Sequence, residues 1–215
     1  MRAPRSMRGL EDLGRVRLSE NFFLRDFLHS EIAALYGFSN IPDDPDLAIE
    51  TGTALCQTLL EPLQRSFGRL HIRSGYRSAE VNGFGNAKGL NCGSNAANAA
   101  GHIWDRRDAE GCRGATACVV VPWVADRYPA PGDWQRLAWW IHDHLPYSDL
   151  EFFPKLWAVN IQWHERPKRR ISSFAAPRGV LTKPGMANHH IEHGEAYAGF
   201  PVLVGIAPGV SRSPH

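Results

Sequence analysis

The sequence predicts an α+β protein of a single domain, with helices in the N-terminal part and a small antiparallel sheet after them. Apolar side chains recur at helical spacing between residues 19 and 67. From residue 114 onward, short apolar or alternating segments of strand length are separated by turn residues. A chain of 215 residues suits one domain of ordinary size.

Two long helices are expected in the N-terminal part. The first is expected to begin at its cap, Ser19, and to end at Gly37. Its apolar face consists of Phe23, Phe27, Ile32 and Leu35. Residues 45–67 predict the second helix, and Pro62 inside it predicts a kink, because proline removes one backbone hydrogen bond.

The remaining elements are shorter. Strands are expected at residues 70–72, 115–123, 151–153, 158–163 and 170–174. Residues 133–145 predict a tryptophan-rich helix capped by Asp133. Residues 82–114 are rich in Gly, Asn and Ala and indicate a long loop region, which in compact domains often carries function.

The chain divides into three parts on composition. Residues 1–17 are expected to be a flexible arm, residues 18–181 the domain, and residues 182–215 a flexible tail rich in Gly and Pro. The tail contains His189, His190 and His193, and three imidazoles so close together could hold a divalent metal. Adventitious binding by a mobile tail is the favoured interpretation of this run.

Composition excludes several classes of protein. Hydrophobic content of 43% and charged content of 21% are typical of a globular domain, and the net charge of +2 gives no reason to expect nucleic-acid binding. No apolar run is long enough to span a membrane, and residues 1–17 lack the apolar core of a secretory signal. We therefore expect a cytoplasmic protein with free thiols at its cysteines, which are Cys56, Cys92, Cys112 and Cys118.

The most informative segment is residues 72–78, Ile-Arg-Ser-Gly-Tyr-Arg-Ser. A short strand is expected to end at Gly75, and Ser78 is suited to cap a helix that begins at Ala79. Arg73 and Arg77 flank the glycine, and two guanidiniums in such a turn can grip both oxygens of a carboxylate. The alternative is a turn whose arginines are only solvated.

Together with Asn82, this segment reads I-x-S-G-Y-R-S-x-x-x-N and resembles the signature of the zinc D-alanyl-D-alanine carboxypeptidases, metallopeptidase family fifteen. Their fold is shared with the hedgehog signalling domain and several phage endolysins. The resemblance covers roughly residues 18–175 and implies a hedgehog-like fold. It also implies substrate binding by Arg77, with Arg73, Ser74 and Tyr76 beside it.

The sequence departs from this family at every metal ligand. The family pattern H-x-x-G-x-A-x-D-I, aligned on residues 114–119, puts Gly111 in place of the histidine and Cys118 in place of the aspartate. On the later strand, Asn160 takes the place of the last histidine and Trp157 that of the catalytic glutamate. Zinc needs imidazole or carboxylate ligands here, so a literal interpretation of the motif leaves no metal.

Other side chains could rebuild the site. The catalytic candidates are His102, Asp105, Asp108 and Cys118. A shifted site for zinc or another divalent metal could use His102, Asp108 and His164. Cys118 could supply a thiolate with His102 as its base. The alternatives are aspartates that only pair with Arg106 and Arg107, and a cysteine that is part of the core.

We therefore expect a carboxypeptidase-like fold with a rebuilt active site, a hydrolase acting on an amide bond of a small peptide or amino-acid-like substrate. The alternative is a non-catalytic module that binds peptides or carboxylates and derives from a metallopeptidase. A role as a structural partner protein has only the basic run at residues 166–170 and the histidine-rich tail in its favour. The expected partner is a small ligand, with no nucleic acid and no membrane.

Overall fold

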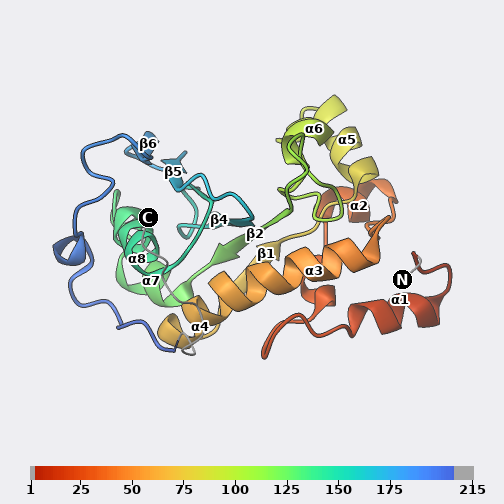
Figure 1. Ribbon diagram of the computed structural model, residues 1–215, viewed down its shortest axis with the longest axis horizontal. Coiled ribbons are helices and arrows are strands. Elements are labelled where there is room, and N and C mark those ends of the chain that lie inside the picture. The colour runs from red at the N-terminus through yellow and green to blue at the C-terminus, as the bar shows by residue number, and fades with distance from the viewer. Residues whose placement is uncertain (1–2, 206–215) are drawn as a thin grey trace.

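The computed structural model describes residues 3–205 and forms an α+β domain around one six-stranded sheet (Figure 1). Its strands are β1 (His71–Ser74), β2 (Gly114–Val120), β3 (Asp149–Phe152), β4 (Val159–His164), β5 (Arg170–Ser173) and β6 (Gly179–Thr182). Its longer helices are α1 (Met7–Gly14), α3 (Pro45–Leu55), α4 (Glu61–Phe67), α5 (Ala79–Ala87) and α8 (Trp134–His144). The shorter ones are η1 (Leu24–Phe27), α2 (Glu31–Tyr36), η2 (Cys56–Leu60), α6 (Asn95–Asn98), α7 (Pro122–Arg127) and η3 (Gly194–Tyr197).

The sheet is mixed, whereas the sequence predicted an antiparallel one. Its strand order is β1-β2-β4-β3-β5-β6, and every neighbouring pair is antiparallel except β3 and β5. The connection from β4 to β5 makes that pair parallel, because it crosses over β3 before the chain re-enters the sheet. The expected strands at residues 70–72, 115–123, 151–153, 158–163 and 170–174 all exist, with boundaries shifted by at most three residues. Strand β6 was not predicted.

The helix expected from Ser19 to Gly37 is two separate short elements. The Asp26 carboxylate accepts from the Phe23 backbone N–H at 2.8 Å and closes the 3-10 turn η1. The Ser30 hydroxyl then caps α2, and Gly37, in the left-handed region with φ 74°, ends it. Hydrogen bonds from the backbone to the side chains of Asp26 and Ser30 thus divide the single helix that the spacing of apolar residues predicted.

The second predicted helix is continuous in space but changes its winding. Residues 56–60 form a turn of π-helix, η2, between α3 and α4. Pro62 falls in the first turn of α4, directly after this wider turn, and its missing N–H is compatible with a change of hydrogen-bond pattern at this point. Cys56 in that turn is fully buried.

Helix α3 contacts β2 and β4 on the apolar face of the sheet, where Figure 1 shows it running alongside β1 and β2. The core there is dominated by large aromatic side chains, among them the fully buried Trp104, which packs against Phe27 at a ring distance of 5.2 Å. A Cβ at Gly75 would lie 2.7 Å from the Phe27 Cβ, and one at Gly52 would lie 2.8 Å from the Trp104 ring. Both glycines therefore permit close packing around these rings.

Both terminal segments contain ordered elements. Helix α1 lies in the expected arm, and its Ser6 hydroxyl accepts from the Gly9 N–H. The expected tail packs on α8: Trp140 Nε1 donates to the Pro201 carbonyl at 2.8 Å, and His193 is 7% exposed. The rest of the expected tail, residues 206–215, lies outside the described residues.

All four cysteines are buried and unpaired, as predicted. Among residues 3–205, no helix combines the length and apolar character needed to cross a bilayer.

Asp105 links the start of α3 to the core and yields a stability prediction. Its Oδ2 accepts from the Asp43 N–H at 2.7 Å and from the Tyr76 hydroxyl at 3.1 Å, while burial raises the pKa of Asp105.

Asp105→Asn keeps an acceptor and removes a buried charge, so its free energy of unfolding should stay within about 1 kcal/mol of the parent value. Asp105→Ala should lower it by about 2–4 kcal/mol, because both donors lose their partner. Urea unfolding of both variants checks this, and equal losses would contradict it.

Candidate functional site

The face of the sheet opposite α3 is polar near its centre. The register sets Thr116 on β2 opposite Gln162 on β4. On β3, Asp149 pairs with Gln162, and Glu151 pairs with Asn160. Because directly opposed residues in a sheet point to the same side, these five side chains share one face. Their neighbours along the strands, such as Leu150 and Ile161, are buried on the other face.

A cavity of about 270 Å³, which we call the polar pocket, lies over this face. It is lined by those five residues and by Ala97, Asn98, Gly101, His102, Lys168 and Arg170. The pocket therefore combines carboxylates, amides, cations and one imidazole in a small volume. This mixture is typical of a site for a polar ligand or for proton transfer.

The polar pocket is closed on one side by the segment that precedes β2. The Thr116 N–H donates to the Gly101 carbonyl at 2.9 Å, and Gln162 Nε2 donates to the Ala100 carbonyl at 2.9 Å. A Cβ at Gly114 would lie 2.2 Å from the Ala100 oxygen, so only glycine permits this approach. These contacts hold His102 at the rim of the sheet's polar face.

His102 has a defined tautomer and is uncharged at neutral pH. Its Nδ1 lies 2.9 Å from the Gly75 carbonyl, so Nδ1 carries the hydrogen and donates it. Burial and the nearby guanidinium of Arg77 lower the pKa of His102 to about 4. The Nε2 atom therefore keeps a lone pair at neutral pH, with which it can accept a proton or a hydrogen bond.

The two carboxylates of β3 are held in different ways. Arg170 binds Asp149 through two nitrogens, at 2.7 and 3.2 Å, whereas Glu151 accepts from Asn160 Nδ2 at 3.2 Å. Burial raises the pKa of Asp149, although Arg170 partly opposes it. Burial, with a further contribution from the charge of Asp149, raises the pKa of Glu151. Glu151 is therefore the carboxyl better placed to exchange a proton.

The predicted aspartates Asp105 and Asp108 lie apart from the lining of the polar pocket. Asp105 binds the start of α3, as described above. Asp108 accepts from the Cys112 N–H at 2.8 Å and lies 3.1 Å from His164 Nε2. The structure thus brings Asp108 and His164 together, as the metal hypothesis required, but gives His102 a separate place. The arginines between the aspartates contact other partners: Arg106 pairs with Asp43, and Arg107 donates to the Gly111 carbonyl.

Cys118 lies opposite Asn160 on the polar face and is 5% exposed. Burial raises the pKa of Cys118 to about 11, although Arg73 opposes this. The thiol therefore stays protonated at neutral pH, and the geometry gives no support to a thiolate nucleophile.

The two arginines of the motif differ: Arg77 is bound inside the domain, whereas Arg73 is exposed. Arg77 Nη1 donates to Asn82 Oδ1 at 3.1 Å and to Cys92 Sγ at 3.2 Å, so this guanidinium already has partners in the domain. Tyr76 is 1% exposed and is out of a ligand's reach. Arg73 is exposed, and Ser74 pairs with Cys118 beside it. Of the predicted substrate-binding residues, Arg73 is the most accessible to a ligand. The predicted cap of α5 by Ser78 is confirmed.

A group able to hold a metal exists elsewhere in the molecule. Within residues 3–205, the only set of three or more His, Cys, Asp or Glu residues with suitably close ligand atoms is His142, Asp143 and His193. The predicted set of His102, Asp108 and His164 is not gathered in this way.

Of the eleven residues that line the polar pocket, only His102 was among the predicted site residues. Those that were missed include Thr116, Asp149, Glu151, Gln162, Lys168 and Arg170. A usable signal was present, because polar residues alternate with apolar ones in residues 149–152 and 159–162. Alternation of this kind identifies the polar face of a strand, but only the register shows that the two strands combine their polar faces in one pocket.

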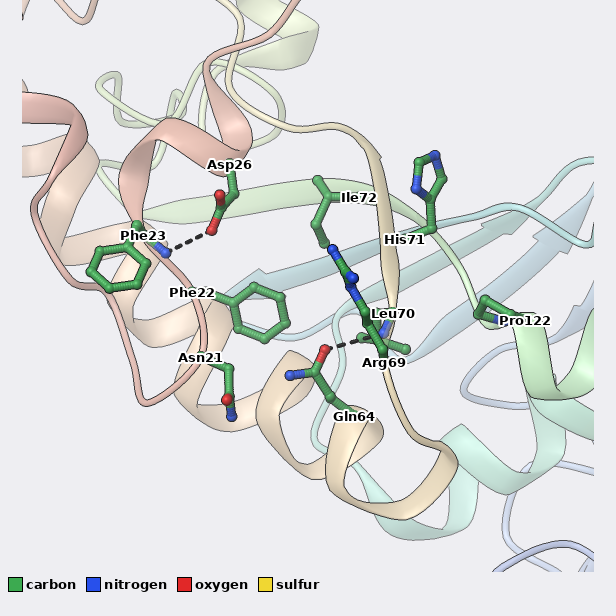
Figure 2. Close-up of a pocket in the computed structure, with 10 residues that line it drawn as sticks. All are labelled: Asn21, Phe22, Phe23, Asp26, Gln64, Arg69, Leu70, His71, Ile72 and Pro122. Atoms are coloured by element: carbon green, nitrogen blue, oxygen red, sulfur yellow. Dashed lines mark hydrogen bonds between the residues drawn. The ribbon is translucent and has the colours of Figure 1, made fainter. Parts of the chain in front are cut away.

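A larger cavity, of about 960 Å³, lies beside the edge strand β1 between residues 21–26 and 69–72 (Figure 2). Its carboxylate, Asp26, accepts from the Phe23 N–H, and one of its two amides, Gln64, accepts from the Leu70 N–H at 3.1 Å. Arg69 and His71 also line this cavity. Because its carboxylate is already bound to the backbone, the larger cavity is less suited to acid–base chemistry than the polar pocket.

No family model, no curated protein and no solved structure matches this chain.

The tautomer and charge of His102 give a prediction for stability against pH. An unfolded chain binds a proton to this ring near the ordinary pKa of 6.5, whereas the folded protein does so only near 4. The free energy of unfolding should therefore fall as the pH is lowered from 6.5 towards 4. His102→Asn, which can still donate to Gly75, should show a smaller fall over this window. Urea unfolding at a series of pH values measures both, and parallel curves would refute the assignment.

Proposed function

We propose that the protein binds a small peptide or amino-acid-like molecule in the polar pocket and hydrolyses an amide bond in it. Glu151 and His102 are the residues that move and direct protons. The observation that carries the proposal is that a neutral imidazole and a carboxyl group of raised pKa line the same small cavity.

The size and charges of the pocket support a small zwitterionic substrate. A volume of about 270 Å³ accommodates only part of a short peptide. The β3 carboxylates can receive an amine, while Arg73, exposed at the other side of Cys118, can receive a carboxylate. Three strand spacings of about 4.8 Å separate β1 from β3, a distance that a peptide of about four residues can span.

The resemblance to the zinc carboxypeptidases supports the same class of substrate. In that alignment Cys118 and Asn160 replace two metal ligands, which must be neighbours in space, and the two residues are directly paired across β2 and β4. The Ser-Gly-Tyr-Arg-Ser motif also lies where β1 ends and α5 begins. A hedgehog-like fold is therefore part of the proposal.

The reaction would proceed by direct attack of water. The Glu151 carboxylate takes a proton from the water while the water's oxygen forms a bond to the carbonyl carbon of the amide. His102 Nε2 accepts a hydrogen bond that orients the water or the ligand. The carbon–nitrogen bond then breaks, and the protonated Glu151 returns its proton to the leaving amine, so that atoms and charge balance. Lys168 and the Asn160 amide offer donors for the negative oxygen formed on the way.

A second function, non-catalytic binding of a peptide or carboxylate, is favoured by two observations. Among residues 3–205, no metal-capable group includes a residue of the polar pocket. The Cys118 thiol is also protonated at neutral pH. Binding without turnover by the wild-type protein would select this alternative.

Glu151→Gln should separate binding from chemistry. Loss of the proton acceptor should reduce hydrolysis by about 10²–10⁴-fold, whereas ligand affinity should fall far less, because the amide has nearly the same shape and Asp149 still offers a carboxylate to the amine. Hydrolysis is measured by mass spectrometry on a panel of di- and tripeptides and N-acyl amino acids, and affinity by calorimetry. Glu80→Gln, at an exposed position on α5, is the matched control and should leave both unchanged. Undiminished hydrolysis by Glu151→Gln would refute the role of this residue.

The pH profile offers an independent test of Glu151. Glu151 must be ionised to act as a base. The value of kcat/KM should therefore fall at acid pH as Glu151 becomes protonated, and its raised pKa places this fall at a higher pH than for an ordinary glutamate. Asp149→Asn removes a negative charge that raises this pKa, and the acid limb should move to lower pH. An acid limb that stays in place or moves to higher pH would exclude Glu151 as the titrating group.

A further inference from the structure

A second cluster of titratable groups lies where residues 188–197 pack on the C-terminal end of α8. His142 and Asp143 belong to the last turn of this helix, and His193 comes from a segment about fifty residues later. One potential ligand atom of each residue lies within 4.8 Å of those of the other two. His142 and His193 are buried, at 6% and 7% exposure.

We propose that His142, Asp143 and His193 form a binding site for a divalent transition metal, with zinc as the ion that fits best. Two imidazoles and one carboxylate are a donor set that zinc prefers, and three protein ligands leave one position for water. The site is separate from the polar pocket and does not depend on the proposed hydrolysis.

The supporting contacts of the two histidines are those that metal ligands need. A ligating histidine presents its second ring nitrogen to a fixed partner, which orients the ring. His193 Nε2 lies 2.9 Å from the Asn188 carbonyl, and His142 Nδ1 lies 2.7 Å from the Tyr147 hydroxyl. Trp139 stacks on the His193 ring at a centroid distance of 3.7 Å and an angle of 8°. Both rings are therefore held in place before any metal arrives.

Of the remaining nitrogens, one already faces a second ligand of the site and the other faces a backbone carbonyl. His193 Nδ1 lies 2.9 Å from Asp143 Oδ1. Two ligands at about 2.0–2.1 Å from a tetrahedral zinc lie roughly 3.3 Å apart, close to this separation. Zinc would take the place of the hydrogen between these two atoms, and the displaced proton would go to solvent. His142 would bind through Nε2, which now donates its hydrogen to the His189 carbonyl at 2.9 Å, so zinc binding would replace this hydrogen bond and release a second proton to solvent.

The carboxylate is oriented as well, and the site is accessible. The second oxygen of Asp143 accepts from the Tyr197 hydroxyl at 2.9 Å. A cavity of about 660 Å³ is lined by His142, Asp143 and Tyr197, and its other walls include His189, His190 and Glu192. This cavity gives the ion a path to the site and leaves room for a water at the fourth position. The bound ion would fasten residues 188–197 to α8.

Zinc titration of the full-length, tag-free protein tests the site, after treatment with chelator and exchange into metal-free buffer. Calorimetry should find one equivalent of zinc. His193→Ala and His142→Ala should each weaken binding at least a hundredfold. His190→Ala is the matched control, because this exposed histidine belongs to the same run, and its affinity should stay within threefold of the parent value. At a hundredfold excess over Kd, zinc should raise the melting midpoint by about 5–10 °C.

Two results would overturn the proposal. Absence of stoichiometric binding would mean that these contacts form only a hydrogen-bond network. Equal weakening by His190→Ala and His193→Ala would mean adventitious binding by the histidine run. Asp143→Asn serves if the alanine variants fail to fold, because it keeps the side-chain volume and should still lower the affinity. X-ray absorption of the zinc-loaded protein should report two imidazoles in the first coordination shell, and a shell without imidazole would equally refute the site.

Discussion

The polar pocket depends on the insertion of Trp104 between α3 and the sheet. The indole is fully buried, its Nε1 donates to the Thr116 carbonyl at 3.0 Å, and it lies so close to Gly52 that no side chain fits there. The Trp104 carbonyl in turn accepts from the Thr51 hydroxyl at 3.1 Å. A residue so fixed also constrains His102, which lies two positions earlier in the chain, so the chemistry of the pocket depends on a packing contact in the core.

Burial controls the electrostatics of the site more than ion pairing does. Removal from water raises the pKa of Asp149 despite the two bonds from Arg170, and it lowers the pKa of His102. The groups of the pocket thus shift toward their neutral forms. The neutral imidazole keeps a lone pair that can accept a hydrogen bond, and the carboxyl group of raised pKa is a stronger base than an ordinary one. The proposed proton transfers therefore do not require an ionised thiol at Cys118.

Local features were predictable from the sequence because they depend on neighbouring residues. The cap at Ser78, the end of α2 at Gly37 and the buried strand near residues 115–120 follow from side-chain chemistry and periodicity. The polar pocket was not predictable, because it requires the register that sets Glu151 beside Asn160 and the crossover that makes β5 parallel to β3. The same holds for His193, whose neighbours on α8 are some fifty residues away. Asp105 was predicted as a catalytic residue. In the structure it accepts a hydrogen bond from the Asp43 N–H, far away in the sequence, and no local pattern indicates this role.

We propose that the polar pocket, rather than the larger cavity beside β1, receives the ligand. The most direct measurement is a titration of ¹⁵N-labelled protein with a panel of short peptides that carry free carboxylates, followed by two-dimensional NMR. The amide signals of His102, Glu151 and Asn160 should shift on binding. Shifts confined to residues 21–26 and 69–72, which line the cavity in Figure 2, would contradict it.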